Sequence, residues 1–490
     1  MSEIENNNRG FIENSSIYMI STVISFAIPM LALPVYTRYL SPADFGIVVL
    51  FIMFGNLLTG LLSGSLHFAA YRYYFKYKGD LKRFKILNST NMLSLILIFM
   101  LSGIIVYLFS DWFSSALFDR QLTKKLIQWS FVSGCLRYLF LYMTTLLTVQ
   151  VRAIQFALFS ISQIILNTIF SFYFIFQFSL TYMARIYEIL LSQGIIVFFL
   201  FLITSNLFEF RFSLSSLKKS IKLTYPLIPN SLIGVIQGSF DKTMLNKFTG
   251  TMSVGFYSFG ERFSAILKMV TDSVQKVWGP FFMKKAHENT QESKQAIIDQ
   301  FYKMAFFFMV VGVCVIYFSE EMIKLLTTKE FHPAMYVTPI YVYFYLFAVM
   351  GKIAMEQISF SEKMIYLLPA TIGGVIINVI MNLILIPKFG AVGAAGATAV
   401  SALFINIFHL YYGMKLYPLP LGKIKLATLY LIVIGLTILV YPIMAYDMNV
   451  FLKIFMKIII IISFIFMGLK LKYISISDFN KLLVPLKFSR

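Results

Sequence analysis

Residues 221–285 read IKLTYPLIPNSLIGVIQGSFDKTMLNKFTGTMSVGFYSFGERFSAILKMVTDSVQKVWGPFFMKK, two long apolar runs that meet at the short polar turn KFTGTMSVG. Each run is long enough for a membrane-spanning helix, yet together they carry seven charges, at Asp241, Lys242, Glu261, Arg262, Lys268, Asp272 and Lys276. A charged group in lipid is costly, so it usually faces a bundle interior or a water-filled cavity. We therefore expect this helical hairpin to line the cavity of a transporter.

The composition of the whole chain supports a membrane protein. Hydrophobic residues make up 59% of the 490 residues and charged residues only 13%, and the mean hydropathy is +0.78. A soluble protein of this length needs a more highly charged surface. The net charge of +20 comes from basic residues in short gaps between apolar runs, a pattern that favours anionic membrane lipids as partners over nucleic acid.

Apolar runs of helix length follow one another along the chain. Because about 20 mostly apolar residues cross a bilayer, we predict an all-α polytopic membrane protein with about fourteen transmembrane helices. The predicted helices cover residues 15–38, 43–67, 86–109, 125–150, 153–176, 181–205, 222–247, 254–280, 300–319, 335–359, 364–386, 392–413, 425–446 and 452–470.

The connections between these helices differ in charge. Even-numbered connections, such as the segment 72–85, hold most of the Lys and Arg residues, and odd-numbered connections hold few. Cytoplasmic loops carry an excess of positive charge. The sequence therefore predicts a multi-pass protein with both termini in the cytoplasm.

A weak internal repeat divides the chain. Residues 37–46 align with residues 246–255, so that Arg38 meets Lys247 and Gly46 meets Gly255, and the loop spacing follows the same offset of 209. An offset of six helices preserves orientation, which indicates a parallel repeat. We expect three regions: an N-terminal lobe of helices 1–6 at 1–212, a C-terminal lobe of helices 7–12 at 213–416, and helices 13 and 14 with a cytoplasmic tail at 417–490.

Three stretches of the chain resemble a known family. They are residues 28–46 (IPMLALPVYTRYLSPADFG), residues 225–280 around DKTMLNKFTGTMSVGFYSFGERF, and residues 382–401 (NLILIPKFGAVGAAGATAVS). The third is the most specific, with an Asn-containing helix end, Ile-Pro, a tight turn and a helix start rich in small residues. The chain resembles the polysaccharide flippase branch, for O-antigen or capsule repeat units, of the multidrug/oligosaccharidyl-lipid/polysaccharide exporter superfamily.

This resemblance implies a fold and a function. It implies fourteen helices, two six-helix lobes around a central cavity, and a place in the bacterial plasma (inner) membrane. It also implies a non-enzyme that carries an undecaprenyl-pyrophosphate-linked oligosaccharide to the outer leaflet by alternating access, in contact with a polysaccharide polymerase. The sugar composition, the type of polysaccharide and coupling to a proton or sodium ion are left open.

The charges on predicted helix 8 share one face. Glu261, Ala265, Lys268, Asp272 and Lys276 follow one another at steps of three and four residues, which places them on one side of a helix. The stripe either contacts a ligand or neutralises itself against helix 7. Pairs of Asp241 with Arg262, and of Lys242 with Glu261, are expected because the hairpin places them at similar depth.

Arg137 lies near the middle of predicted helix 4 and has no acidic residue within four positions. Its guanidinium offers a planar fork of donors that suits a phosphate group. We therefore predict a phosphate contact, with pairing to Asp241 or Asp272 as the alternative.

Two other intramembrane cations have local acidic neighbours. Arg185 has Glu188 three residues on and Lys352 has Glu356 four residues on, spacings at which side chains on a helix can meet. The spans hold more cations than anions, which suits an anionic head group. The candidate substrate-binding residues are Arg137, Asp241, Lys242, Glu261, Arg262, Lys268, Asp272, Lys276 and Lys352.

Other classes of function fit the sequence less well. It has no glycine-rich nucleotide loop, and its four histidines lie in separate segments, so we expect no cofactor and no metal site. A polymerase or ligase acting on the same lipid-linked sugar is an alternative, but it would be expected to carry a large external loop. A drug/cation antiporter of the same superfamily is a second alternative, and it would favour an acidic cavity.

Overall fold

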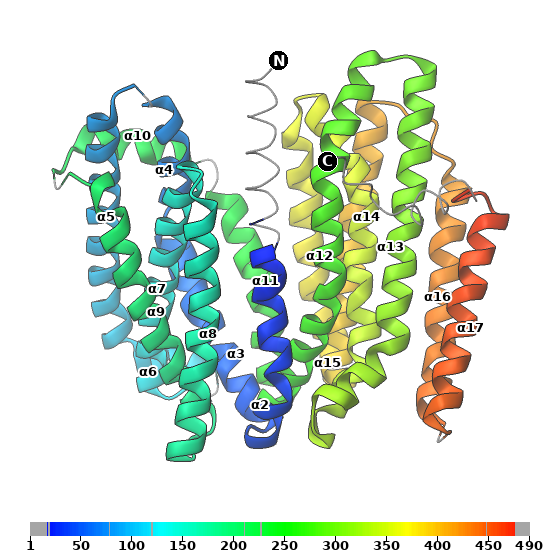
Figure 1. Cartoon of the computed structure of the whole chain (residues 1–490), viewed down its shortest axis with the longest axis horizontal. Coiled ribbons are helices and arrows are strands. Elements are labelled where there is room, and N and C mark those ends of the chain that lie inside the picture. The colour runs from blue at the N-terminus through cyan, green and yellow to red at the C-terminus, as the bar shows by residue number, and fades with distance from the viewer. Residues whose placement is uncertain are drawn as a thin grey trace, which may run out of the picture. The chain divides into compact units, whose positions relative to one another are not determined.

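The computed structural model describes residues 17, 20–77, 79–118, 121–209, 211–225, 228–446 and 448–475. The side chains at 228–237, 273 and 276 lie outside this description. Within these ranges every regular element is helical (Figure 1), so the predicted all-α class is confirmed.

The α-helices are α2 (Leu33–Tyr39), α3 (Pro42–Leu62), α4 (Leu66–Lys76), α5 (Leu81–Leu108), α6 (Ser110–Phe118), α7 (Lys124–Val149), α8 (Ala153–Phe178), α9 (Tyr182–Thr204), α10 (Leu214–Thr224), α11 (Ile228–Thr249), α12 (Thr251–Glu288), α13 (Gln291–Leu326), α14 (Thr338–Phe360), α15 (Leu367–Leu416), α16 (Lys423–Ala445) and α17 (Val450–Lys470). Short 3₁₀ helices occur at Ser205–Leu207, Lys329–Tyr336 and Met364–Tyr366.

Eleven helices in the described part of the chain are long and apolar enough to cross a membrane, the first of them Ile20–Tyr39. One covers Met364–Leu416 and contains the 50 residues of α15. At 1.5 Å per residue a straight helix of that length would reach about 75 Å, more than twice the ~30 Å hydrocarbon core. It turns at Gly390 (φ 55°, ψ −129°), where the sequence predicted a break, and so provides two spans. With this division, and with the charged helices α11 and α12, the fourteen predicted helices are accounted for.

The turn within α15 depends on two glycines. Gly390 has a positive φ, a conformation that side chains other than glycine rarely adopt. Three residues on, a Cβ at Gly393 would lie 2.3 Å from the carbonyl oxygen of Leu385. The small-residue run therefore lets the second half of α15 pack closely on the first.

The chain forms two compact units. Unit 1 consists of Met1–Gly255 and Leu326–Glu330, and unit 2 of Phe256–Leu325 and Phe331–Arg490. In unit 1, α11 packs on α3 and α6, with the Asn246 side-chain amide donating to the Phe118 carbonyl at 3.3 Å. The boundary between the units after Gly255 is defined by packing. The predicted lobe boundary at residue 212 is defined by the sequence repeat instead, so the two lobes stay a prediction.

Helix α7 is the helix around which unit 1 is arranged. It packs against α3, α4, α5, α6, α8 and α9. It crosses α3 at Gly55 and Gly134, where a Cβ on either glycine would lie 2.3 Å from a backbone oxygen of the other helix. The Tyr142 hydroxyl donates to Asn88 Oδ1 at 2.6 Å and ties α7 to α5. Polar side chains thus fix the apolar helices of this unit at defined positions.

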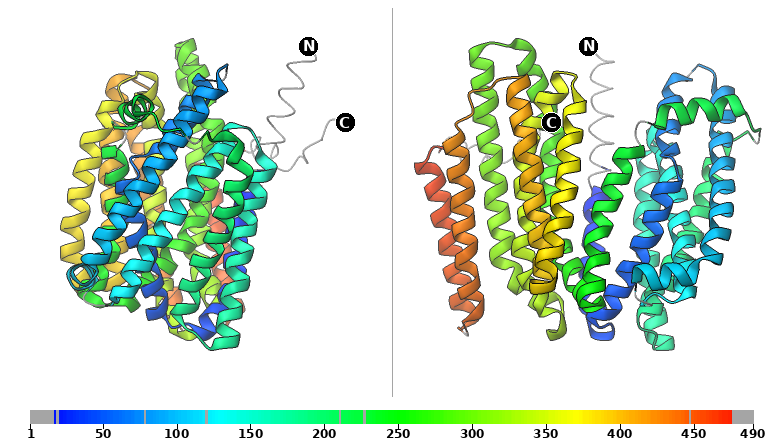
Figure 2. Two further views of the ribbon diagram at one scale, coloured as in Figure 1. Left: turned by 90° about the vertical axis from the view of Figure 1, so that its left-hand side faces the viewer. Right: turned by 180° about the vertical axis from the view of Figure 1, so that it is seen from behind.

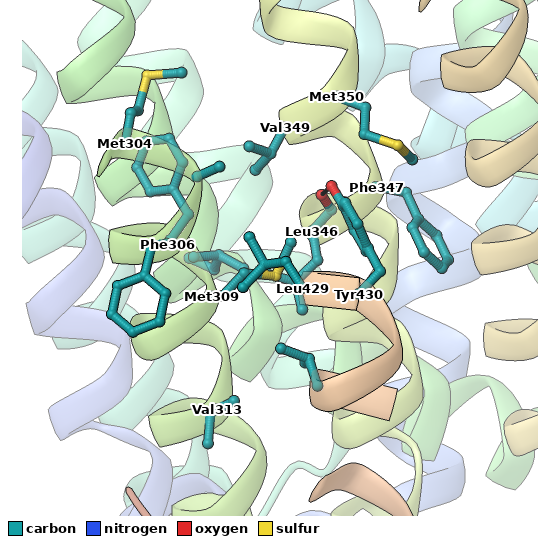
Figure 3. Packing of buried hydrophobic residues seen from close by; sticks show 14 of the residues in the cluster. Met304, Phe306, Met309, Val313, Leu346, Phe347, Val349, Met350, Leu429 and Tyr430 are labelled. Carbon is teal, nitrogen blue, oxygen red and sulfur yellow. Dashed lines mark hydrogen bonds between the residues drawn. The ribbon is translucent and has the colours of Figure 1, made fainter. Parts of the chain in front are cut away.

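The core of unit 2 lies where α13, α14 and α16 meet (Figure 3). Met309, Leu346 and Leu429 pack together there, all fully buried. The Tyr430 hydroxyl donates to the Leu346 carbonyl at 2.7 Å. This bond matters because a polar group that lacks a partner is costly away from water.

Several segments that the sequence assigned to loops are helical. The segment 72–85 contains the last turns of α4, and the segment between the predicted helices 254–280 and 300–319 is helical except for a short break between α12 and α13. Helix α10 packs on α4 and α5 and lies across the ends of the spans of unit 1 (Figure 2). A search for runs of apolar residues finds the part of a helix that lies inside lipid but misses a polar extension into water. For this reason the observed helices are longer than the predicted ones.

Candidate functional site

Helices α12 and α14 pack side by side in unit 2 and run in the same direction. At the start of α14 the Thr338 carbonyl accepts from the Ser264 hydroxyl of α12 at 3.2 Å. Further along, the Gln275 amide donates to Glu356 Oε1 at 2.8 Å. The two helices therefore hold facing polar side chains along several turns.

Polar and charged side chains continue along this helix pair. We call them the polar stripe; its members are Glu261, Lys268, Asp272 and Gln275 on α12, and Tyr341, Tyr345, Lys352 and Glu356 on α14. The Tyr341 hydroxyl donates to Glu261 Oε1 at 3.3 Å. Three of the predicted site residues on α12 thus belong to one arrangement that includes α14.

An ion pair lies in the middle of the polar stripe. Lys268 Nζ is 2.8 Å from Asp272 Oδ2, and the two side chains are 57% and 53% exposed. The predicted local neutralisation on helix 8 is therefore present, but the pair is not buried against a neighbouring helix. Both groups can reach a ligand, and an exposed pair of this kind contributes little to stability.

Lys352 differs from the expectation that it pairs with Glu356. It is half-buried, and it lies within electrostatic range of Lys268, Asp272 and Glu356. Of the described residues, none forms a hydrogen bond or ion pair with its ammonium group. Glu356 instead turns towards α12, where Gly279 leaves room for it: a Cβ there would lie 3.2 Å from Glu356 Oε1. Lys352 therefore does not pair with Glu356, and its contact with a substrate stays a prediction.

Five predicted site residues remain outside this arrangement: Lys276, Asp241, Lys242, Arg262 and, described below, Arg137. The Lys276 side chain lies outside the described residues. Asp241 is 4% exposed on α11 in unit 1, and Lys242 beside it is half-buried. Both of them and Arg262 have interaction partners. Because α11 belongs to unit 1, the expected pairs across the hairpin stay predictions.

Arg137 is exposed on α7 in unit 1. No described residue of that unit donates to it, accepts from it or forms an ion pair with it. Arg185 provides the contrast, since its Nη1 lies 2.9 Å from Oε1 of the fully buried Glu188 and its guanidinium lies 4.4 Å from the Tyr36 ring centre. The local pair of Arg185 was predicted correctly, and the phosphate contact of Arg137 stays a prediction.

One charged cluster was missed by the sequence analysis. Glu320 on α13 accepts from Lys324 at 2.6 Å, from Lys453 at 3.3 Å and from Lys457 at 3.1 Å. Both α17 lysines fall inside the predicted helix 452–470 and are buried in α17, but the sequence analysis assigned them no partner. Lys453 and Lys457 are four residues apart, as are Glu320 and Lys324. This equal spacing, which places each pair on one face of its helix, could have indicated that the two helices pair.

The charged spans, the break at Gly390 and the two helical units can now be compared with known proteins. A family model described as "Polysaccharide biosynthesis protein" matches residues 11–286, more than half of the chain. The protein belongs to the polysaccharide biosynthesis protein family. The family resemblance predicted from the three sequence stretches is confirmed.

One curated protein is similar to part of this chain. The chain is 25% identical over 192 residues to the "Probable low-salt glycan biosynthesis flippase Agl15" of Haloferax volcanii. That match covers 38% of this chain and spans 39% of the relative's length.

Two solved structures share the fold. An inward closed structure of the lipid II flippase MurJ has a TM-score of 0.73 at 16% identity, covering 94% of this chain and 99% of that one. An inward-facing multidrug resistance MATE family transporter of the MOP superfamily has a TM-score of 0.64 at 14% identity, covering 83% and 98%. The fold of this family protein is thus that of multi-pass membrane transporters.

Proposed function

We propose that this protein moves an undecaprenyl-pyrophosphate-linked oligosaccharide repeat unit from the inner to the outer leaflet of the bacterial plasma membrane by alternating access. The family match over residues 11–286 carries the proposal. The names of a related glycan flippase and of a lipid II flippase with the same fold support the class of cargo. The product would serve surface polysaccharide assembly.

The chemistry of the polar stripe suits such a cargo. Lys268 and Lys352 provide ammonium groups for a pyrophosphate, and Asp272 keeps the local charge balanced when the site is empty. Tyr341 and Gln275 are polar without charge, as sugar hydroxyls require. Each already bonds a carboxylate of the stripe, so a sugar hydroxyl would exchange with an existing hydrogen bond.

Energy coupling and partners belong to the same proposal. Asp241 on α11 and Glu261 and Asp272 on α12 are the carboxylates that we propose for binding a proton or sodium ion during the transport cycle. The apolar prenyl tail stays in contact with the bilayer, because its transfer past charged side chains is unfavourable. A polysaccharide polymerase in the same membrane would receive the repeat unit.

The direct test is deletion of the gene, followed by a count of lipid-linked repeat units on each face of the membrane. We expect units to accumulate on the cytoplasmic face and surface polysaccharide to be lost. In the deletion strain, the Lys352→Gln variant should reach a normal protein level but should not restore export. The control variant Lys363→Gln, outside the spans, should reach a normal level and restore export. If single units reach the outer face and are not joined, a polymerase function replaces this proposal.

The predicted orientation has a separate test. In a chain with Cys135 and Cys314 replaced, an impermeant thiol reagent added from outside should label Ser115→Cys in α6. It should not label Glu288→Cys at the end of α12, which is also exposed. The reverse pattern would place the termini outside and overturn the direction of transport.

A further inference from the structure

A second basic site lies in unit 2, apart from the polar stripe. A pocket of about 520 Å³ opens where α13, the start of α16 and the end of α17 meet. The side chains that matter for its chemistry are Asp299, Tyr302 and Lys303 of α13, Lys425 of α16, and Lys472 and Tyr473 after α17. Three lysines and one aspartate leave this pocket positively charged, although none of its residues belongs to the polar stripe.

Lys425 is the best-positioned cation of the pocket. Its Nζ lies 4.6 Å from the Tyr302 ring centre and 5.1 Å from the Tyr473 ring centre, and it donates to the Lys472 carbonyl at 2.9 Å. An ammonium has three donors, and no carboxylate in the described residues lies within ion-pair distance of this one. Lys425 is therefore held in place by the fold while part of its hydrogen-bonding capacity remains for an anion.

The two aromatic rings are fixed independently of any ligand. The Tyr302 hydroxyl donates to the Gly422 carbonyl at 2.8 Å, and the Tyr473 hydroxyl donates to the Lys425 carbonyl at 2.6 Å. Burial raises the pKa of Tyr473, so this phenol stays protonated and keeps its bond. The rings are 4% and 3% exposed, which makes the pocket wall rigid before anything binds.

The position of the pocket indicates a lipid head group rather than a free anion. Helix α13 has 36 residues, about 54 Å, and so extends beyond a hydrocarbon core of ~30 Å. The same pocket is lined by Leu469 and Ile474, and Phe466, one turn earlier on α17, is 66% exposed. Lysines, interfacial tyrosines and an apolar helix surface thus adjoin one another, as expected at the headgroup level of a membrane.

We infer that this pocket binds the phosphodiester head group of an anionic phospholipid, with Lys425 and Lys472 contacting the phosphate and the acyl chains lying along α17. The bound lipid would link α13, α16 and α17 on the face of the membrane that the charge pattern assigns to the cytoplasm. The inference does not depend on which glycan the protein carries.

The test uses the purified full-length protein in detergent, with lipid binding counted by native mass spectrometry. We expect phosphatidylglycerol to bind in preference to phosphatidylcholine. Lys425→Gln should weaken phosphatidylglycerol binding about fivefold, the effect of one lysine at an anionic surface. The control Lys423→Gln removes an exposed lysine from the same helix end and should change binding less than twofold. Equal binding of the two lipids, or an unchanged affinity of Lys425→Gln, would overturn the site.

Further arms separate the sources of phosphate. Inorganic phosphate at millimolar concentration should not displace phosphatidylglycerol; full displacement would make this a site for the free ion. Farnesyl pyrophosphate that binds more tightly than phosphatidylglycerol, and loses this advantage in Lys425→Gln, would make it a docking site for a prenyl-linked cargo instead. If Lys425→Gln fails to fold, Lys472→Gln decides, because the exposed Lys472 ammonium makes no bond with the described residues.

Discussion

Gly46 at the start of α3 and Gly255 at the start of α12 make equivalent contacts with each other's helix. A Cβ at Gly46 would lie 1.9 Å from the carbonyl oxygen of Thr251, and a Cβ at Gly255 would lie 2.1 Å from that of Pro42. Thr251 follows Pro42 by 209 positions, just as Gly255 follows Gly46. Two stretches that the predicted repeat aligns therefore contact each other through their equivalent glycines.

This crossing predicts that neither glycine tolerates a methyl group. Gly46→Ala and Gly255→Ala should each lower stability by about 1–3 kcal/mol, because the helices must separate to admit the extra carbon. The double variant should lose less stability than the sum of the two single losses, because a single separation of α3 from α12 relieves both clashes. The measurement is the unfolding midpoint of the purified protein in detergent.

The matched control is Gly194→Ala in α9, where nothing lies within 4 Å of the added carbon. Alanine there should leave the midpoint unchanged or raise it, because alanine is favoured over glycine inside a helix. An unchanged midpoint in both crossing variants would show that α3 and α12 are not in this contact.

Much of the fold could be predicted because the signals are local. The break between the predicted helices 15–38 and 43–67 is confirmed by a capping box at Ser41: Ser41 Oγ accepts from the Asp44 amide, and Asp44 Oδ2 accepts from the Ser41 amide at 2.9 Å. The break at Gly390 was predicted for a similar reason, since proline and glycine lie together. Helix extensions outside lipid could not be predicted from apolar windows, because they carry no such signal.

The buried cluster on α13 and α17 makes a strong prediction for stability. Glu320→Gln would leave Lys453 with no ion-pair partner among the described residues and the fully buried Lys457 with Glu321 alone, at 2.6 Å, and breaking a buried ion pair costs about 3–5 kcal/mol. We expect a lower unfolding midpoint and less protein in the membrane. Adding Lys453→Met should restore part of the loss.

The control for this cluster is Lys324→Gln. The Lys324 side chain is 44% exposed, so its loss should cost no more than about 1 kcal/mol. Equal effects of Glu320→Gln and Lys324→Gln would contradict the assignment of Glu320 as the carboxylate that both α17 lysines share.

The site could be predicted only as far as its pairs are local. Arg185 with Glu188 and Lys268 with Asp272 are three and four residues apart, and both pairs form. The bond from Gln275 to Glu356 joins residues on different helices, and the sequence contains no rule for which helices become neighbours. The partner helix α14 was therefore absent from the predicted site, apart from Lys352.

The exposed pair in the polar stripe predicts a loss of transport without a loss of stability. Lys268→Gln should change stability by less than about 0.5 kcal/mol, as expected for an exposed pair on one helix. Export of surface polysaccharide should fall at an unchanged protein level, because the head group loses a charged contact. Lys285→Gln breaks a similar pair with Glu288 near the end of α12 and should leave export intact. Normal export by Lys268→Gln would remove this lysine from the cargo site.

Arg137 gives the sharpest test of the cargo site, because Arg185 serves as a matched control. Arg185 has a structural ion pair with Glu188, so comparing the two alanine variants separates a structural role from a ligand role. Arg185→Ala leaves a carboxylate buried without its partner, and we expect loss of protein from the membrane, at a cost of about 3–5 kcal/mol. Arg137→Ala removes an exposed side chain that no described residue of its unit engages. Its protein level should stay normal while export is lost, since the pyrophosphate loses a charge-assisted partner.

Arg137→Lys completes this series and tests the geometry of the contact. It keeps the positive charge but not the planar fork of donors, so export should be partly retained. Export and membrane protein levels are measured together in all three variants. A structural role would show itself differently, because Arg137→Ala would then lower the protein level, and neutralising an acid elsewhere would restore it. Full export by a normally expressed Arg137→Ala variant would exclude an essential phosphate contact at this position, and the stripe cations Lys268 and Lys352 would then have to bind the head group without it.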